Sequence, residues 1–185
     1  MNLDIALKRT SVREITADDV PPLASYWVDL DPVFMKSMGV DVEKIPARNA
    51  LVEMISQQLT QSYREKKAYA IVWLMNNEAI GHCNVNKITF GEEATMHLHI
   101  WKKDARQKGI GTALVKQTLP YFFNNLRLKK LWCEPYAPNP APNKTLEKVG
   151  FEFVKEYVTV PGALNFEQPV KQWLMTRDKF LTIAE

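Results

Sequence analysis

The stretch WKKDARQKGIGTALVKQ, residues 101–117, combines glycines with cationic side chains where an apolar strand pattern runs into a helical one. A strand that leads through a glycine-rich turn into a helix leaves backbone N–H groups unpaired at the positive end of the helix dipole. Gly109 and Gly111 would let that backbone approach a phosphate, and Arg106 and Lys108 would add positive charge. We therefore expect this turn to bind an anion.

This turn differs from the best-known phosphate-binding loops. A Walker loop needs G-x-x-x-x-G-K-[ST], which the sequence lacks here, and the dinucleotide fingerprint fails because Leu114 stands in place of its third glycine. A lone G-x-G also occurs in ordinary tight turns. The glycines alone therefore do not identify the ligand, and the residues around the turn must be considered as well.

Histidines stand on the strand pattern ATMHLHIW that precedes the turn. Side chains alternate along a strand, so His97, His99 and Trp101 are expected to share one face. Imidazole titrates near neutral pH, which makes His97 a candidate general base, directly or through a water, and His99 a second one. The alternative for His97 is a hydrogen-bonded residue of a pocket wall. His82 has no motif around it.

Length, hydrophobic content and net charge indicate which class of protein to expect. With 185 residues, 46% of them hydrophobic, the chain is expected to form one domain over residues 1–185, with a core at about 9–178. Its apolar runs are too short for a membrane span and its start lacks a signal-peptide pattern, so we expect a soluble cytoplasmic protein without a membrane partner. The net charge of +3 is mild, and we interpret Trp101 and Trp132 as core residues, so no nucleic-acid partner is expected.

Neither thiol chemistry nor a metal site is expected from the sequence. Cys83 and Cys133 lack a disulfide or C-x-x-C pattern and are interpreted as buried thiols, not as nucleophiles. The three histidines lack nearby carboxylates, so their ligand set is incomplete and no metal is predicted.

The order of patterns predicts an α+β protein with one mixed, mostly antiparallel sheet of about seven strands and helices on both faces. Pro120 is expected to kink or shorten its helix, and Thr16 to cap another. The expected strands are 9–15, 68–75, 80–88, 94–101, 128–136, 151–160 and 170–177, and the expected helices are 17–27, 45–67, 111–126 and 143–150.

Two motifs resemble the GNAT superfamily of N-acetyltransferases. RQKGIG, residues 106–111, looks like the family motif R/Q-x-x-G-x-G/A, whose backbone amides bind the pyrophosphate of acetyl-coenzyme A (acetyl-CoA). EPYAPNPAPNKTLEKVGF, residues 134–151, is similar to the later segment in which an asparagine begins a short helix that closes with Gly-Phe. The element order from Arg13 to Arg177 also fits the family fold.

The resemblance implies acetyl-CoA as acyl donor, bound where strands 94–101 and 128–136 splay apart. It implies that Asn139 contacts the pantetheine arm. However, the prolines around Asn139 predict a helix that starts late, near Asn143, with Asn143 as its N-cap. The residues proposed for the donor site are Ile100, Trp101, Arg106, Gln107, Lys108, Gly109, Ile110, Gly111, Thr112, Asn139 and Asn143.

The resemblance also implies direct attack of a primary amine on the thioester. Many members use a tyrosine to protonate coenzyme A where this chain has Leu146, so Tyr136 or Tyr157 would have to replace it. Other members use a glutamate on the strand that here has none between Ala94 and Trp101; Glu92 and Glu93 precede it and are interpreted as solvated. The alternative function is a catalytically silent acyl-CoA-binding module.

The acceptor is left open by the sequence. The chain resembles the branch of aminoglycoside 6'-acetyltransferases, siderophore-type lysine acyltransferases and ribosomal-protein acetylases. The acceptor can therefore be a small-molecule amine, an aminosugar or a protein N-terminus. A homodimer is also compatible with the sequence. Segments 28–46 and 159–169 would build the acceptor groove. In the first of them, acidic and apolar side chains could hold a cationic amine, or form a solvated loop: Asp29, Asp31, Asp41 and Glu43 with Phe34, Met35 and Met38.

Overall fold

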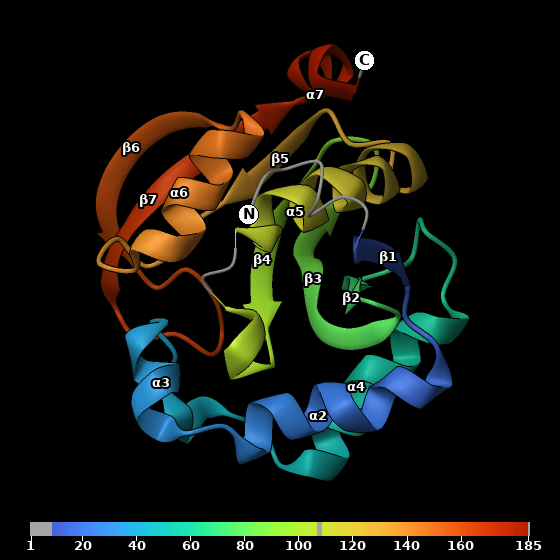
Figure 1. Ribbon diagram of the computed structural model, residues 1–185, viewed down its shortest axis with the longest axis vertical. Coiled ribbons are helices and arrows are strands. Elements are labelled where there is room, and N and C mark those ends of the chain that lie inside the picture. The colour runs from blue at the N-terminus through green and yellow to red at the C-terminus, as the bar shows by residue number, and fades with distance from the viewer. Residues whose placement is uncertain (1–8, 107–108, 185) are drawn as a thin grey trace.

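One mixed sheet runs through the computed structural model, which describes residues 9–106 and 109–184. Within these residues seven strands lie in the order β1-β2-β3-β4-β5-β7-β6 (Figure 1). The β4–β5 pair is parallel and the other described pairs are antiparallel, which confirms the expected fold class. The strands are β1 (Thr10–Glu14), β2 (Tyr69–Met75), β3 (Glu78–Thr89), β4 (Glu93–Ile100), β5 (Lys130–Cys133), β6 (Glu152–Thr159) and β7 (Gln168–Thr176).

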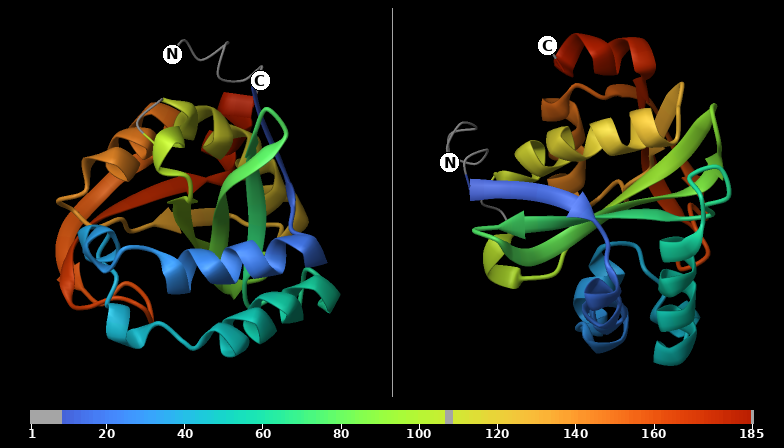
Figure 2. Two further views of the ribbon diagram at one scale, coloured as in Figure 1. Left: turned by 60° about the horizontal axis from the view of Figure 1, so that its bottom comes forward. Right: turned by 90° about the vertical axis from the view of Figure 1, so that its right-hand side faces the viewer.

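Helices cover both faces of this sheet (Figure 2). The helices α5 and α6 lie on one side, and α2 and α4 lie on the other. The helices are α2 (Val20–Asp29), α3 (Pro32–Ser37), α4 (Arg48–Thr60), α5 (Ile110–Pro120), α6 (Pro140–Val149) and α7 (Arg177–Ala184). Short turns of other helix types are η1 (Ala17–Asp19), η2 (Val42–Lys44), η3 (Lys103–Ala105) and η4 (Tyr121–Asn125).

The two faces of the central strands differ in polarity. On one face, apolar side chains such as Ile71, Val85 and Met96 join α5 in the main core. Because side chains alternate, the intervening residues of β3 and β4, among them His82 and His97, point to the side of α2 and α4. The sheet therefore has an apolar face under α5 and a partly polar face opposite.

The predictions for Pro120 and Thr16 are confirmed, and the turn between β2 and β3 has the geometry that its residues favour. Asn76 and Asn77 adopt positive φ angles of 51° and 66° between β2 and β3, the conformation that a tight hairpin turn requires. α5 ends at Pro120, and the π-helical turn η4 follows it, as expected where proline interrupts the helical hydrogen bonds. Near Thr16, the Asp19 carboxylate accepts the Thr16 N–H at 2.7 Å and so closes the capping box of η1.

Other boundaries were wrong. The helix expected over 45–67 is α4, from Arg48 to Thr60, and Met54 is 58% exposed although its spacing had placed it on the apolar face. Two helices, α3 and α7, were not expected. α7 packs Phe180 on Phe123 with ring centroids 4.6 Å apart, so the core extends beyond residue 178.

The segment after α3 is bound to the loop between β6 and β7. Val40 forms a bridge with Asn165, and the Gly39 carbonyl accepts N–H groups from Asn165 at 2.8 Å and Gln168 at 3.2 Å. The Asp41 N–H donates to the Leu164 carbonyl at 2.8 Å. Two segments far apart in the sequence thus form one wall.

Gly39 should be essential to this wall. Its φ is +83°, and an added Cβ would overlap Oε1 of Gln168, whereas Gly91, with φ +81°, would place a Cβ in open space. We expect Gly39→Ala to lower the free energy of unfolding by about 2 kcal/mol more than Gly91→Ala, because only the former adds a clash to the backbone strain. Urea unfolding of both variants measures the difference. Equal losses would contradict a tight contact at Gly39.

Candidate active site

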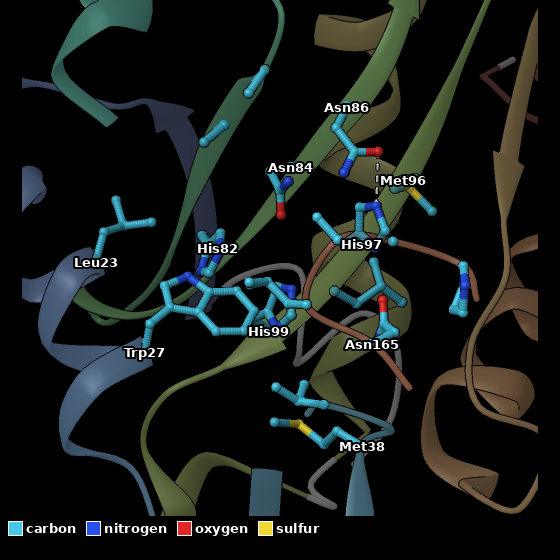
Figure 3. Close-up of a pocket in the computed structure, with 18 of the residues that line it drawn as sticks. Leu23, Trp27, Met38, His82, Asn84, Asn86, Met96, His97, His99 and Asn165 are labelled. Carbon is cyan, nitrogen blue, oxygen red and sulfur yellow. Dashed lines mark hydrogen bonds between the residues drawn. The ribbon is translucent and has the colours of Figure 1, made fainter. Parts of the chain in front are cut away.

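A cavity of about 590 Å³ lies between the polar face of β3 and β4, helices α2 and α4, and the wall formed by the α3 and β6–β7 segments (Figure 3). Its lining includes His97 and His99 from one face of β4 and Met96 and Leu98 from the other. The cavity therefore reaches both sides of the sheet at β4.

This passage exists because β4 and β5 separate. Their pairing ends at Met96 and Cys133, where the Cys133 thiol donates to the Met96 carbonyl at 3.1 Å. β4 continues to Ile100, while the chain after β5 turns toward β7, where Tyr136 forms a bridge with Val170. The predicted splaying is confirmed, and we call this point the fork.

The N-terminus of α5 lies in the predicted anion-binding turn, of which Gln107 and Lys108 lie outside the described residues. Gly109 is the N-cap with a left-handed φ of +71°, and no described side chain caps this end of α5. The first helical turn, which contains Ile110 and Thr112, therefore has unpaired backbone N–H groups. At Gly111 an added Cβ would lie 3.3 Å from Oγ1 of Thr145, so this glycine also allows α6 to pack closely on α5.

Arg106 binds back onto the end of β4. Its guanidinium group donates to the Ile100 carbonyl at 3.1 Å and to the Trp101 carbonyl at 3.2 Å. It also lies over the Phe34 ring of α3, 3.6 Å from the ring centre. Arg106 thus holds the turn after β4 against α3.

The start of α6 corrects the sequence-based expectation for Asn139 and Asn143. The helix begins at Pro140, and Asn139 is its N-cap, accepting the Ala141 N–H at 3.3 Å. Prolines fit there because first-turn N–H groups have no intrahelical partner. Asn143 is not the N-cap: it lies inside α6, where it donates to the Asn139 carbonyl at 2.8 Å and accepts the Trp173 indole N–H at 2.9 Å. Asn139 lines the cavity.

His82 and His99 form a stacked pair in the lining of the cavity. They are opposite each other in the β3–β4 register, and their ring centroids are 4.7 Å apart. The Trp101 indole N–H donates to Nδ1 of His82 at 2.7 Å, so the neutral His82 carries its proton on Nε2. The Tyr26 hydroxyl lies 3.1 Å from Nδ1 of His99. A register shift between Asn86 and Thr89 sets this pairing, so counting residues from the hairpin turn would not have placed His82 opposite His99.

His97 has different partners, although it lines the same cavity. Its Nε2 lies 3.0 Å from Oδ1 of Asn86, as Figure 3 shows. An amide oxygen only accepts hydrogen bonds, so Nε2 carries the proton and Nδ1 has the lone pair. His97 can therefore accept a proton at Nδ1.

All three histidines are neutral at pH 7. Burial lowers the pKa of His82 to about 3, and the nearby His97 adds to this effect. Burial, followed by the positive charge of Lys87, lowers the pKa of His97 to about 4, while Glu134 opposes the change. Burial holds the pKa of His99 well below its ordinary value.

A carboxylate lies at the fork, one residue beyond β5. Oε1 of Glu134 accepts the Tyr157 hydroxyl at 2.6 Å and the Gln172 amide at 2.7 Å. Burial and this hydrogen bond raise the pKa of Tyr157 to about 12. Glu134 and Tyr136 line the cavity. Leu146, at the position where a tyrosine was considered, is fully buried in the main core.

Three of the four acidic residues considered for the acceptor groove have other partners, which favours the alternative of a solvated loop for them. Asp29 pairs with Arg48 at 2.7 Å, and Asp31 and Asp41 cap α3 and η2. None of the four acids is among the described residues that line the cavity. The predicted segments do line it, through Met38, Val40, Lys44 and Pro46 and through Pro161, Gly162, Ala163, Leu164, Asn165 and Gln168.

Residues 9–106 and 109–184 were also compared with the requirements of a metal site, a reactive cysteine and a membrane-spanning helix. No three His, Cys, Asp or Glu side chains there gather as a metal site requires. Both cysteines are buried, and burial raises their pKa values, so they remain thiols. No described helix is long and apolar enough to span a bilayer.

Comparisons with known proteins agree with this geometry. Residues 9–152 match the family model described as the acetyltransferase (GNAT) domain. No curated protein matches the chain.

Several solved structures share the fold. Spermidine N-acetyltransferase from Vibrio cholerae, in complex with coenzyme A and spermine, has a TM-score of 0.75 at 18% identity over 94% of this chain and 99% of its own. RimL, a ribosomal-protein alpha-N-acetyltransferase in complex with coenzyme A, has a TM-score of 0.74 at 14% identity, over 92% and 96%. The aminoglycoside acetyltransferase AAC(6')-Ib, also with coenzyme A, has a TM-score of 0.71 at 18% identity, over 95% and 99%. At these identities the likeness establishes the fold.

The buried histidines should make stability depend on pH. Their ordinary pKa is 6.5, so between pH 6.5 and about 4 the unfolded chain binds protons that the folded chain does not. Unfolding takes up protons there, and the free energy of unfolding should fall by about 1.4 kcal/mol per pH unit for each histidine as pH decreases. His82→Asn keeps an acceptor for Trp101 but does not titrate, so its slope should be smaller. Urea unfolding at pH 7.5, 6 and 5 measures both slopes, and identical slopes would contradict the buried neutral state of His82.

Proposed function

Because the chain belongs to the GNAT acetyltransferase family, we propose that it transfers an acetyl group from acetyl-CoA to a primary amine. The observation that carries this proposal is the fork, where a cavity lined by β3 and β4 extends to Glu134, Tyr136 and Asn139 beyond the end of β5. A thioester placed through the fork would meet an amine that enters from the pocket. Three solved structures with this fold are complexes with coenzyme A, which supports the choice of donor.

The donor site that we propose has two parts. Unpaired N–H groups of Gly109–Thr112 at α5 would bind the pyrophosphate. Gln107 and Lys108, outside the described residues, are proposed for the same site from the sequence motif. The backbone of Ile100 and the side chain of Asn139 would contact the pantetheine arm. Trp101, Arg106 and Asn143 would act as positioning residues, because their hydrogen bonds hold the turn after β4 and the start of α6.

The chemistry is direct transfer. The amine nitrogen bonds to the thioester carbonyl carbon, the resulting adduct loses a proton from nitrogen, the C–S bond breaks, and the sulfur takes up a proton. We propose that Nδ1 of His97 accepts the nitrogen proton. A pKa of about 4 makes His97 too weak a base for a free alkylammonium ion but suits the more acidic ammonium of the adduct. The amine would therefore lose its first proton to water.

Two further residues have proposed roles in this step. Tyr136 lines the cavity near Asn139 and would donate the proton to sulfur. His99 would act indirectly, because its partner is Tyr26 and its ring stacks on His82.

We propose that the enzyme works in the cytoplasm, with residues 1–185 as one domain. Acyl-CoA and an amine are the expected partners, and neither a nucleic acid nor a membrane is expected. The acceptor can be a small-molecule amine, an aminosugar or a protein N-terminus, and a homodimer is compatible with each.

A thiol-release assay with acetyl-CoA and a panel of primary amines tests this function. We expect release with at least one class of amine, and His97→Gln should lower kcat by about 10²-fold to 10⁴-fold, the usual contribution of a general base. The KM for acetyl-CoA should not change, because His97 is proposed to act only on the amine proton.

Glu156→Gln, on the exposed strand β6, is the control for substitution itself. Unchanged kcat in His97→Gln would rule out its role as base. Tight binding of coenzyme A without release for any amine would instead favour a silent acyl-CoA-binding module.

A further inference from the structure

The charged groups of the cavity are few and mostly positive. Among the described residues that line it, Glu134 is the one carboxylate, while Lys44 and Lys67 are cationic. Lys44 is held in the wall, where its Nζ donates to the Asn165 carbonyl at 2.8 Å and pairs with Asp41 at 3.3 Å. The cavity therefore offers one anionic position to a ligand.

That position is at the fork. Both hydrogen bonds that described residues donate to Glu134 go to Oε1, from Tyr157 and Gln172, so Oε2 is left to accept from a ligand. Glu134 also acts electrostatically on His97, whose pKa it raises against the effect of burial. Glu134 and His97 line the same cavity, so this carboxylate can hold an amine group that enters it.

A buried oxygen on β3 lacks a hydrogen-bond donor. Oδ1 of Asn84 is buried and has no hydrogen bond within the described part of the chain. Asn84 lies opposite His97 in the β3–β4 register and lines the cavity. A buried acceptor without a donor costs free energy until a ligand supplies an N–H group. A primary amine has such groups.

On the side of α2 and α4 the cavity is mainly apolar. Apolar side chains form most of its lining there, together with Gln57, Gln58 and Gln61. Burying a charge on such a surface without a partner is strongly unfavourable. These apolar residues are Leu23, Trp27, Leu51, Met54 and Ile55.

We propose that the acceptor is an amine with one positive charge and an apolar body, anchored through its amine group by Glu134. This rests on the proposed function and deepens it. Further ammonium groups of a polyamine or an aminosugar would face the apolar wall or the lysines Lys44 and Lys67, and so weaken binding. The same chemistry occurs in alkyl and arylalkyl amines and in a peptide N-terminus that begins with an apolar residue.

Acceptor preference tests the proposal on the unmodified enzyme. The panel is 2-phenylethylamine, a dipeptide amide with an N-terminal leucine, spermidine and kanamycin. We expect kcat/KM for one of the first two to exceed that of spermidine and kanamycin by about 100-fold, as expected where unpaired charges oppose the wrong substrate. The better of the first two identifies the source of the amine. A preference for spermidine or kanamycin would overturn the proposal and leave acetyl transfer intact.

Glu134→Gln tests the anchor. This substitution keeps an oxygen for Tyr157 and Gln172 and removes the charge, so the KM for the preferred amine should rise by about 10-fold or more while the KM for acetyl-CoA stays constant. Glu156→Gln is again the matched control on an exposed strand. An unchanged amine KM in Glu134→Gln would overturn the role of Glu134.

Calorimetric binding of 2-phenylethylamine and of the dipeptide amide, each with coenzyme A present, separates this inference from the proposed function. Binding that weakens in Glu134→Gln, without turnover of any amine, would support the recognition and reject the transfer. No binding and no turnover for either ligand would reject both.

Discussion

The separation of β4 and β5 is the constraint on which the rest of the site depends. Parallel strands that pair fully leave no passage through a sheet, because their backbone groups bind one another. Here pairing stops at Met96 and Cys133, and the chain after β5 turns to bridge β7 at Tyr136 and Val170. The segment of β4 beyond Met96 therefore has no partner in β5, and the cavity opens beside it.

Burial decides the chemical state of the groups at this passage. Histidines are usually chosen as bases because they titrate near pH 7, but His82, His97 and His99 lie on a covered face and stay neutral far below it. A neutral imidazole with a low pKa is a weak base, which accepts a proton only from a more acidic group and releases it readily. Of the three histidines, His97 is the one whose pKa is raised by the carboxylate of Glu134, which partly offsets the effect of burial.

The segment around α3 contacts both the turn before α5 and the loop between β6 and β7. Phe34 belongs to α3, next to the acceptor wall, and stacks on Arg106, which holds the turn before α5. Gly39, a few residues later, binds the β6–β7 loop through Gln168. One short segment therefore contacts both the turn before α5 and the β6–β7 loop, so the shape of the cavity wall and the position of that turn depend on each other.

Local patterns in the sequence were enough to locate the strands and the glycine turn at Gly109, because alternation, turn residues and helix ends depend on neighbours along the chain. The family motifs also indicated the splayed strands. Tertiary structure alone decided which polar groups meet. Asp41 caps a turn and does not face the acceptor, and Asn143 binds Trp173 of β7 and does not cap α6. Such partners are set by register and by the approach of distant segments, which no local pattern encodes.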